Sequence, residues 1–300
     1  MSWSIRLFDL LISLSEKHKD AIIPGYTHLQ VAMPSSFGMF FAAYAETIID
    51  DVRFLKAAYD VVDQNPLGSA ASYGSSFPLD RDMTTELLGF GAMHVNSLSA
   101  QFSRGKTEKS VAMAIGSLAG TIGNMANDIV VFMSQNFGFL TFPDEYTTGS
   151  SIMPHKKNPD VFELVRGHCN RLQNLPNEFG YLLTNLTAGY SRDKQLLKEI
   201  LLPAIERMRS SLRISTFVLS KVVIKEGVLD NPIYDPMYTV EDLNKMVNDG
   251  IPFRDAYIEI GKRVQSGNYT PTKTINHTHV GSIGNLCNDR IVEKMNAVLG

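Results

Sequence analysis

Several features that would place this chain in other protein classes are missing from its 300 residues. No apolar run approaches the roughly 18 consecutive residues that a membrane-spanning helix needs. The N-terminus lacks the basic segment and uninterrupted apolar stretch that are typical of a signal peptide. We therefore expect a soluble, cytoplasmic protein with no membrane partner.

The charge of the chain shows no bias toward either sign. Its 28 Lys and Arg nearly balance 31 Asp and Glu, which gives a net charge of -3, and no basic tract stands out. These observations argue against a nucleic-acid partner. They leave open a local basic pocket for an anionic small substrate.

Cysteine is scarce, and no metal-ligand spacing is present. Cys169 and Cys287 lie far apart, so we expect two reduced thiols rather than a disulfide. The segment His277-Thr278-His279 resembles a pair of metal ligands, but no carboxylate or third histidine stands at a supporting interval. We interpret this pair as structural and predict no metal site.

Strand signals are few, whereas helical periodicity is extensive. Apolar residues recur at helical spacing from Ile5 onward, and Pro34 suits the first turn of a second helix. The sequence predicts five long helices, over residues 4–19, 34–60, 106–137, 160–183 and 193–225. Pro176 and Pro203 are expected to kink the last two.

The third of these runs is rich in small residues. In an exposed helix interior, Gly116, Gly120 and Gly123 would each cost about 1 kcal/mol relative to alanine. We interpret them as positions at which neighbouring helices approach closely in a bundle. Helices this long need more cover than one short chain provides, so we expect them to pack against copies of themselves.

The pattern changes after Asn231-Pro232. Shorter helices, joined by turns rich in Gly, Pro, Asn and Thr, are predicted over residues 240–248, 253–266 and 282–299. We place a domain boundary near residue 228. It separates a central helical-bundle domain, 1–228, from a small helical C-terminal domain, 229–300.

One polar segment holds the residues that a carbon–heteroatom lyase needs, Gly149-Ser150-Ser151-Ile152-Met153-Pro154-His155-Lys156-Lys157-Asn158-Pro159. Lys156 and Asn158 can donate to a carboxylate, and the following helix start adds free N–H groups. A carboxylate held in this way takes up negative charge when the adjacent carbon loses its proton. Ser150 or Ser151 would then be the base. From composition alone, an ordinary interhelical connection is an equal alternative.

This segment resembles the signature of the fumarase/aspartase superfamily, whose members typically eliminate fumarate from a succinyl group. Further motifs make the chain similar to the argininosuccinate lyase family within it. They are Pro24-Gly25-Tyr26-Thr27-His28-Leu29-Gln30, Pro66-Leu67-Gly68-Ser69 with Phe77-Pro78-Leu79-Asp80-Arg81, Lys156-Lys157-Asn158-Pro159-Asp160, Glu86-Leu87-Leu88-Gly89-Phe90 and Pro252-Phe253-Arg254-Asp255-Ala256-Tyr257. The resemblance runs from about Leu10 to Leu286.

The resemblance implies an all-α fold. It is a long-helix bundle of the fumarase/aspartase type, with central helices that pack in a homotetramer and a small helical C-terminal domain. The implied reaction is the reversible β-elimination of argininosuccinate to arginine and fumarate, in arginine biosynthesis, without a cofactor. Met1 falls inside the family's central domain. We therefore expect the N-terminal domain, with its serine-arginine-asparagine motif, to be absent, which would leave every site incomplete.

Carried over residue by residue, the family's serine base falls on Ser150, in a loop expected to close over the substrate. The catalytic histidine falls on His28, and its carboxylate partner on Glu163. A carboxylate beside an imidazole favours the protonated ring and fixes its tautomer, which suits an acid or a water-activating group. Lys156, with Asn158 and the N–H groups of the loop, would stabilise the enediolate.

The resemblance also implies substrate contacts. Thr27 and Asn158 match those to the succinyl part, whereas Tyr190, Gln195 and Lys198 match those near the arginine and carboxylate ends. Gln195 and Lys198 share one side of a helix at i,i+3 spacing, which a solvated helix face explains equally well.

Two alternatives stay open. His155 stands where argininosuccinate lyases often carry glutamine, and histidine there resembles adenylosuccinate lyase, the alternative substrate class. The chain would otherwise be a non-catalytic assembly protein, comparable to the lens crystallins that arose from this lyase family. The absent N-terminal motif favours assembly, whereas the intact set of catalytic residues favours an enzyme.

Overall fold

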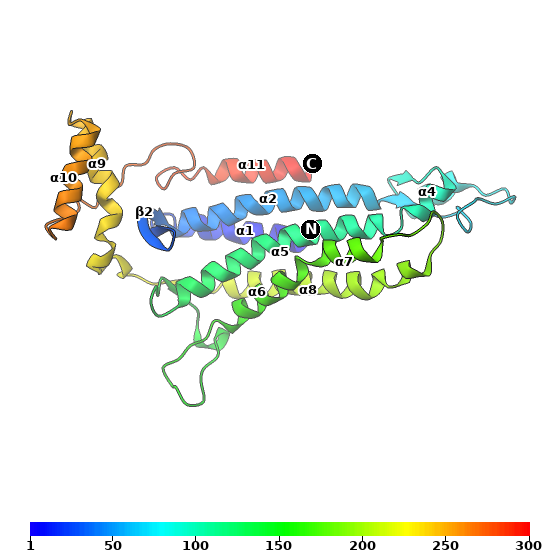
Figure 1. Ribbon diagram of the computed structural model, residues 1–300, viewed down its shortest axis with the longest axis horizontal. Helices are drawn as coiled ribbons and strands as arrows, with labels where there is room; N and C mark the ends of the chain where they lie inside the picture. The colour runs from blue at the N-terminus through cyan, green and yellow to red at the C-terminus, as the bar shows by residue number, and fades with distance from the viewer. The chain divides into compact units, whose positions relative to one another are not determined.

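The computed structural model describes all 300 residues and is mostly helical, as the sequence predicts (Figure 1). The chain forms two compact units, and each is built from three segments. Unit 1 comprises Met1–Arg6, Thr47–Val130 and Thr147–Phe217, and unit 2 comprises Leu7–Glu46, Val131–Tyr146 and Val218–Gly300. These units follow packing rather than chain order, and the domain boundary near residue 228 stays a prediction.

Unit 1 is a helix bundle. It contains parts of α2 (Phe37–Val62), α5 (Lys106–Met133) and α8 (Leu197–Leu219), together with α6 (Asp160–Leu172) and α7 (Leu175–Leu182). The seam between α2 and α5 carries a buried carboxyl group, because Ser117 Oγ donates to Asp51 Oδ1 at 2.7 Å. Asp51 is 3% exposed and its Oδ2 has no partner. Burial raises the pKa of this carboxyl, against the hydrogen bonds from Thr121 and Ser117.

The small residues of α5 permit close helix packing. A Cβ atom on Gly116 would lie 3.4 Å from Pro176 Cγ, and one on Gly123 would lie 3.3 Å from Cys169 Cβ. The distance at Gly123 is tighter than an ordinary contact, so glycine lets α6 approach α5 closely there, whereas a Cβ on Gly116 would make an ordinary contact with α7. The packing interpretation is supported at Gly123 and stays a prediction at Gly116 and Gly120.

The last two predicted long helices are interrupted. The run over 160–183 is divided into α6 and α7, and Pro176 stands in the first turn of α7, where its missing N–H costs nothing. The run over 193–225 begins with a 3-10 turn, η2 (Arg192–Gln195), and continues as α8, which contains Pro203. The periodicity therefore predicts helix correctly but overestimates continuity.

Two polar side chains organise the loops between α2 and α5. This region contains β3 (Gln64–Asn65), α3 (Arg81–Leu88), β4 (Ala92–Met93) and α4 (Ser97–Phe102), and β3 pairs in parallel with β4. The Arg81 guanidinium donates to three carbonyl oxygens at 2.8, 2.9 and 2.7 Å, those of Leu67, Val95 and His94. The buried Asn65 amide donates to threonine hydroxyls of α3. Together they hold a segment that the sequence marks only as a break in helical periodicity.

In unit 2, a β-hairpin stands where the sequence predicts a turn and a helix start. β1 (Ile22–Thr27) pairs antiparallel with β2 (Gln30–Ser36), and Pro24 lies opposite Pro34. The prediction that Pro34 opens a helix is therefore wrong. A two-stranded hairpin tolerates proline because neither strand is central in a sheet. Helix α2 begins at Phe37, and a Cβ on Gly38 would lie 2.5 Å from Lys19 Cα, just after α1 (Ser2–Lys17).

Aromatic side chains form the core beneath this hairpin. Tyr26 meets Phe137 edge-on at a centroid distance of 5.2 Å, and Phe132 lies 5.4 Å from the fully buried Phe139. Phe37 packs against Phe132 at 6.2 Å. The adjacent β5 (Leu140–Thr141) pairs antiparallel with β6 (Val223–Ile224). The cluster therefore connects the hairpin, through Tyr26 near its turn, to the start of α2.

The C-terminal residues of unit 2 form three helices, α9 (Thr239–Asn248), α10 (Phe253–Gln265) and α11 (Asn288–Leu299), preceded by the 3-10 turns η3 (Val228–Asp230) and η4 (Pro232–Tyr238). Leu243, Ala256 and Ile260 form the small core of the α9–α10 pair. Asn288 Nδ2 donates to Ser15 Oγ at 2.9 Å and thereby joins α11 to α1. Helix α11 starts later than predicted because residues 281–285 form a hydrogen-bonded turn. No helix of the chain has both the length and the apolar character needed to cross a bilayer.

Candidate active site

The signature loop, residues 147–159, connects η1 (Asp144–Tyr146) to α6 and projects away from the helices of the bundle (Figure 1). An isolated antiparallel bridge closes its base, because Asn158 N donates to Thr148 O at 2.8 Å. Asn158 Nδ2 also donates to Thr148 Oγ1 at 3.3 Å, and Thr148 Oγ1 donates to Asp160. Asn158 therefore already performs a structural task besides its predicted contact with substrate.

Ser150 lies just inside this closed base and is half-buried. Its Oγ accepts hydrogen bonds from the backbone N–H groups of Met153, at 3.2 Å, and Ile152, at 3.4 Å. Two N–H donors directed at one hydroxyl oxygen stabilise negative charge on that oxygen. This is the local environment that a serine base requires, whereas the neighbouring Ser151 is exposed.

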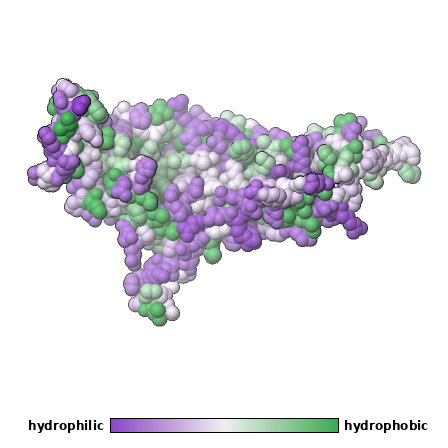
Figure 2. All heavy atoms as spheres, in the orientation of Figure 1, coloured by the Kyte–Doolittle hydropathy of each residue, from purple (hydrophilic) through white to green (hydrophobic).

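The tip of the loop is exposed and partly apolar. Ile152 is 83% exposed and Met153 is 37% exposed, and Figure 2 shows hydrophobic atoms at this tip. Lys156 is exposed on the same loop. Ser150 and Lys156 therefore lie on an accessible loop rather than in a hydrophobic seam, which is the arrangement that their predicted roles require.

Glu163 lies in the first turn of α6, and its exposed side chain follows the loop directly. Pro159 is the N-cap residue of this helix, and it offers no side-chain cap. Asp160 and Glu163 place two carboxylates at the positive end of the helix dipole, which stabilises both charges. The helix start thus holds the carboxylate that the resemblance pairs with His28.

His28 occupies the tip of the unit 2 hairpin. The turn consists of His28 and Leu29, with φ values of 55° and 58°, between the paired residues Thr27 and Gln30. Two-residue hairpin turns with positive φ at both positions normally use Asn and Gly, because other side chains are strained there. Non-glycine residues held in this conformation cluster at functional sites. The strained turn therefore points to a functional role for His28 independently of the sequence motif.

Thr27 and His28 are exposed and belong to unit 2, whereas Glu163 and the signature loop belong to unit 1. The predicted pairing of His28 with Glu163 stays a prediction. So does the joint contact of Thr27 and Asn158 with a succinyl group.

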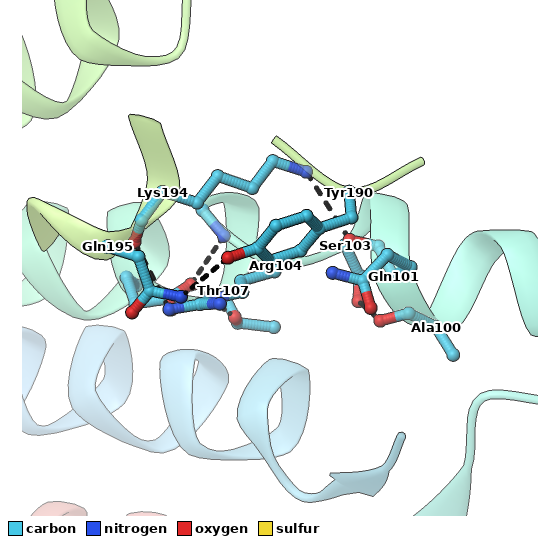
Figure 3. A network of polar contacts seen from close by, with 10 residues as sticks. Ala100, Gln101, Ser103, Arg104, Thr107, Tyr190, Lys194 and Gln195 are labelled. Carbon is cyan, nitrogen blue, oxygen red and sulfur yellow. Dashed lines mark hydrogen bonds and ion pairs between the residues drawn. The ribbon is translucent and has the colours of Figure 1, made fainter. Parts of the chain in front are cut away.

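The three residues predicted near the arginine end lie in unit 1, on and beside η2. Gln195 Nε2 donates to Tyr190 Oη at 3.0 Å, so the structure brings these two together (Figure 3). Both side chains are exposed, and Lys198 is exposed in the first turn of α8. The pair presents an amide and a phenol to solvent, a combination that can bind a guanidinium or a carboxylate.

Sequence reasoning gave no role to two residues that shape this region. Arg81 belongs to one of the family motifs. Nothing in the sequence around it indicates that its guanidinium donates to three backbone carbonyl oxygens. Lys194, next to Gln195, is only 3% exposed, although it stands in a strongly polar segment. Burial of such a residue depends on α4 and α5, about ninety positions earlier.

The histidine pair of the C-terminal region has one carboxylate neighbour. His277 Nε2 lies 2.8 Å from Glu241 Oε1, and the rings of His277 and His279 stack at 6.2 Å. No group of three or more His, Cys, Asp and Glu side chains could hold a metal ion. The interpretation of this pair as structural stays a prediction.

The bundle fold is that of solved lyase-type enzymes. An EDDS lyase in complex with formate superposes with a TM-score of 0.82 at 19% identity, over 99% of this chain and 66% of that one. The class II fumarase of Schistosoma mansoni gives 0.77 at 16% identity, again over 99% and 66%. At these identities the likeness concerns the fold alone. It agrees with the predicted fumarase/aspartase type of bundle.

A family model described as "Lyase" matches residues 3–173, which is more than half of the chain. The chain belongs to this lyase family. It is 54% identical to the argininosuccinate lyase of Phocaeicola vulgatus over 98% of its length and 38% identical to that of Stenotrophomonas maltophilia over 85%. The predicted resemblance is thus confirmed. The chain spans 66% of the length of the Phocaeicola enzyme.

Proposed function

We propose that this chain supplies the central catalytic parts of an argininosuccinate lyase, which splits argininosuccinate reversibly into arginine and fumarate. The 54% identity to such an enzyme over 98% of the chain carries the proposal. The accessible signature loop also supports it, because two backbone N–H groups donate to Ser150 Oγ and favour a negative charge on that oxygen. We also propose a cytoplasmic location, in accordance with the sequence-based expectation.

In the proposed mechanism, deprotonated Ser150 removes a proton from the carbon next to a substrate carboxylate. The electron pair of the C–H bond passes into that carboxylate, and the resulting enediolate is stabilised by Lys156 and Asn158. The enediolate then collapses to fumarate as the C–N bond breaks and its electrons leave with the guanidinium nitrogen. The His28–Glu163 pair supplies the proton to this nitrogen. No cofactor takes part.

The rest of the substrate is held by neighbouring segments. Thr27 joins Asn158 at the succinyl part. Tyr190, Gln195 and Lys198 bind the arginine and carboxylate ends, and the hydrogen bond between Gln195 and Tyr190 fixes two of these side chains relative to each other. Preorganisation of this kind lowers the entropic cost of binding.

The active assembly is a homotetramer in which each site gathers motifs from three subunits. Large apolar side chains on the unit 1 helices support this proposal, since Met113 on α5, Leu164 on α6 and Leu202 on α8 are 58%, 65% and 63% exposed. Exposed apolar patches on soluble helices commonly mark interfaces. A monomeric elution profile in size-exclusion chromatography would contradict the tetramer.

The decisive experiment follows fumarate by its ultraviolet absorbance after argininosuccinate is added to the purified chain. Wild type, Ser150→Ala and the matched control Ser151→Ala are compared, with circular dichroism to verify that all three are folded. We expect the control to keep its activity and Ser150→Ala to lose about 100- to 10,000-fold, the usual contribution of a general base. Full activity in Ser150→Ala overturns the assigned base, and a folded, inactive wild type overturns activity of this chain by itself.

Adenylosuccinate is the second candidate substrate, and the observation that favours it is His155 in the signature loop. Parallel assays with both succinyl compounds separate the two candidates. Turnover of adenylosuccinate alone would replace the proposed substrate and leave the roles of Ser150 and Lys156 unchanged.

A further inference from the structure

A cavity of about 470 Å³ lies in unit 1, away from the signature loop. It is bounded by the last residues of α2, by α4 and the start of α5, and by the segment from Leu183 to Lys194. Its volume falls in the usual range for small-molecule sites. Neither Ser150 nor any predicted substrate contact lines it.

The charge of its lining is of one sign. Four cationic side chains line the cavity, and no aspartate or glutamate does; the cations are Arg104, Lys106, Lys109 and Lys194. Glu108, outside the lining, forms an ion pair with Arg104 at 4.0 Å through Oε1, while its Oε2 accepts from Gly105 N at 2.6 Å and Thr107 Oγ1 at 2.8 Å. This one carboxylate offsets part of the charge of four cations, so the cavity keeps an excess of positive charge.

Lys194 is the most unusual of these cations, because the residue is only 3% exposed. Its Nζ donates to Gln101 O at 3.4 Å (Figure 3). It also lies 5.9 Å from the centroid of the Phe102 ring. An ammonium group has three donors, so this single long hydrogen bond leaves the buried charge poorly satisfied. Burial, and next the Arg104 charge, lower the pKa of Lys194, whereas Glu108 opposes them. A bound anion would supply the acceptors that the protein does not provide.

The remaining wall combines apolar and neutral polar side chains. Val61, Phe102, Leu183 and Leu186 are its apolar members, and Phe102 is 57% exposed. His94 adds an imidazole whose pKa is lowered by burial and by Arg81, so this ring is neutral at neutral pH. A ligand that matches both parts has an anionic group for the cations and a flat apolar part for the wall.

We propose that this cavity is a binding site for an organic anion, in which a phosphate or carboxylate group meets Lys194 and Arg104 and an aromatic ring lies against Phe102 and the leucines. Arg104 also donates to Lys194 O at 3.2 Å, so the two cations are already linked through the η2 backbone. Because Gln195 follows Lys194 in η2, an anion bound here also holds the turn that carries a predicted substrate contact.

The test uses calorimetric titration of the full chain with two matched pairs of probes. AMP is compared with adenosine, and benzoate with benzamide, so that each pair differs in the anionic group and keeps the ring. The first pair reports on phosphate and the second on carboxylate. The variants are Lys194→Met, Lys194→Arg and a control on α10, Lys262→Met, all checked for folding by thermal unfolding.

We expect at least one anionic probe to bind and its neutral partner to bind at least tenfold more weakly. Lys194→Met should weaken that binding at least tenfold, Lys194→Arg should stay within about threefold of wild type, and Lys262→Met should not differ. Binding should also raise the unfolding temperature of wild type but not of Lys194→Met. The proposal is overturned if neither anion binds, or if Lys194→Met binds as wild type does. These measurements need no turnover, so they stand apart from the outcome of the fumarate assay.

Discussion

The hairpin tip of unit 2 and the signature loop of unit 1 carry the two predicted proton-transfer groups on very different supports. His28 stands in a two-residue turn whose backbone is confined by paired strands on both sides. Ser150 stands in a long loop closed by one isolated bridge and a few side-chain hydrogen bonds. The difference indicates that the histidine is held in place before substrate arrives, whereas the serine can be brought to the substrate by movement of the loop.

After the replacement of Ser150, the largest effect expected from this comparison concerns His28. Replacement His28→Gln keeps a side chain of similar size at the exposed tip but removes the titratable group. We expect fumarate release to fall about 100- to 1,000-fold with an unchanged unfolding transition. His279→Gln, at another exposed histidine, is the matched control. Activity within threefold of wild type in His28→Gln would remove the hairpin from the mechanism.

The second prediction concerns stability alone. Asp51 lies outside both the hairpin tip and the signature loop, so its replacement tests the fold and not the proposed chemistry. Its carboxyl has a raised pKa in the folded state, so the folded protein retains this proton at pH values where the unfolded chain has lost it. The stability contributed by this group is present at low pH and falls as pH rises from about 4. Asp51→Asn should therefore stabilise the chain by about 1–3 kcal/mol at pH 8, the usual cost of an unsatisfied buried polar group.

Urea unfolding of Asp51→Asn and wild type at pH 5 and pH 8 measures this effect. The difference in free energy of unfolding between the two proteins should be larger at pH 8. Equal differences at both pH values would mean that Asp51 does not titrate between the folded and unfolded states.

The third prediction addresses the closure of the loop. Thr148→Val is nearly isosteric but removes the hydroxyl that contacts Asp160 and accepts from Asn158. We expect kcat to fall about tenfold, equivalent to roughly 1.4 kcal/mol, because the loop base is less well defined. Thr274→Val, at an exposed position in unit 2, serves as control. An unchanged kcat would show that this hydroxyl does not position the loop.

The smallest effect concerns the strain of the hairpin. Leu29 is 79% exposed and has a φ of 58°, a conformation that costs an L-residue about 1–2 kcal/mol. Leu29→Gly should relieve most of this cost, offset in part by the greater entropy of glycine in the unfolded chain. We expect a net stabilisation of about 0.5–1 kcal/mol in urea unfolding. Destabilisation would mean that the Leu29 side chain has a packing or assembly role.

The sequence predicts the helices well and the connections poorly. The helix predicted over 106–137 matches α5 at its start, and those over 240–248 and 253–266 match α9 and α10, because periodicity is a local property. The hairpin escaped prediction since its turn is His-Leu rather than Asn-Gly and each strand contains a proline. Its stability comes instead from the aromatic cluster around Phe139, which only the folded chain assembles.

The site shows the same division. The signature motif locates Ser150, Lys156, Asn158 and Glu163 on one loop and the helix that follows it, as its contiguous residues require. The hydrogen bonds that reach Ser150 Oγ and the link between Gln195 and Tyr190 depend on backbone detail that no spacing rule contains. The burial of Lys194 depends on residues distant in sequence, and its polar neighbours predict the opposite.

The two thiols of the chain fall one in each unit. Cys169 is fully buried against α5, and burial raises the pKa of its thiol to about 12, whereas Cys287 is partly accessible before α11. An alkylating reagent at neutral pH should consequently modify Cys287 in the native protein and spare Cys169 until the bundle opens. The signal of a dye on Cys287 and the rate at which Cys169 becomes labelled would then report the unfolding of unit 2 and of unit 1 separately.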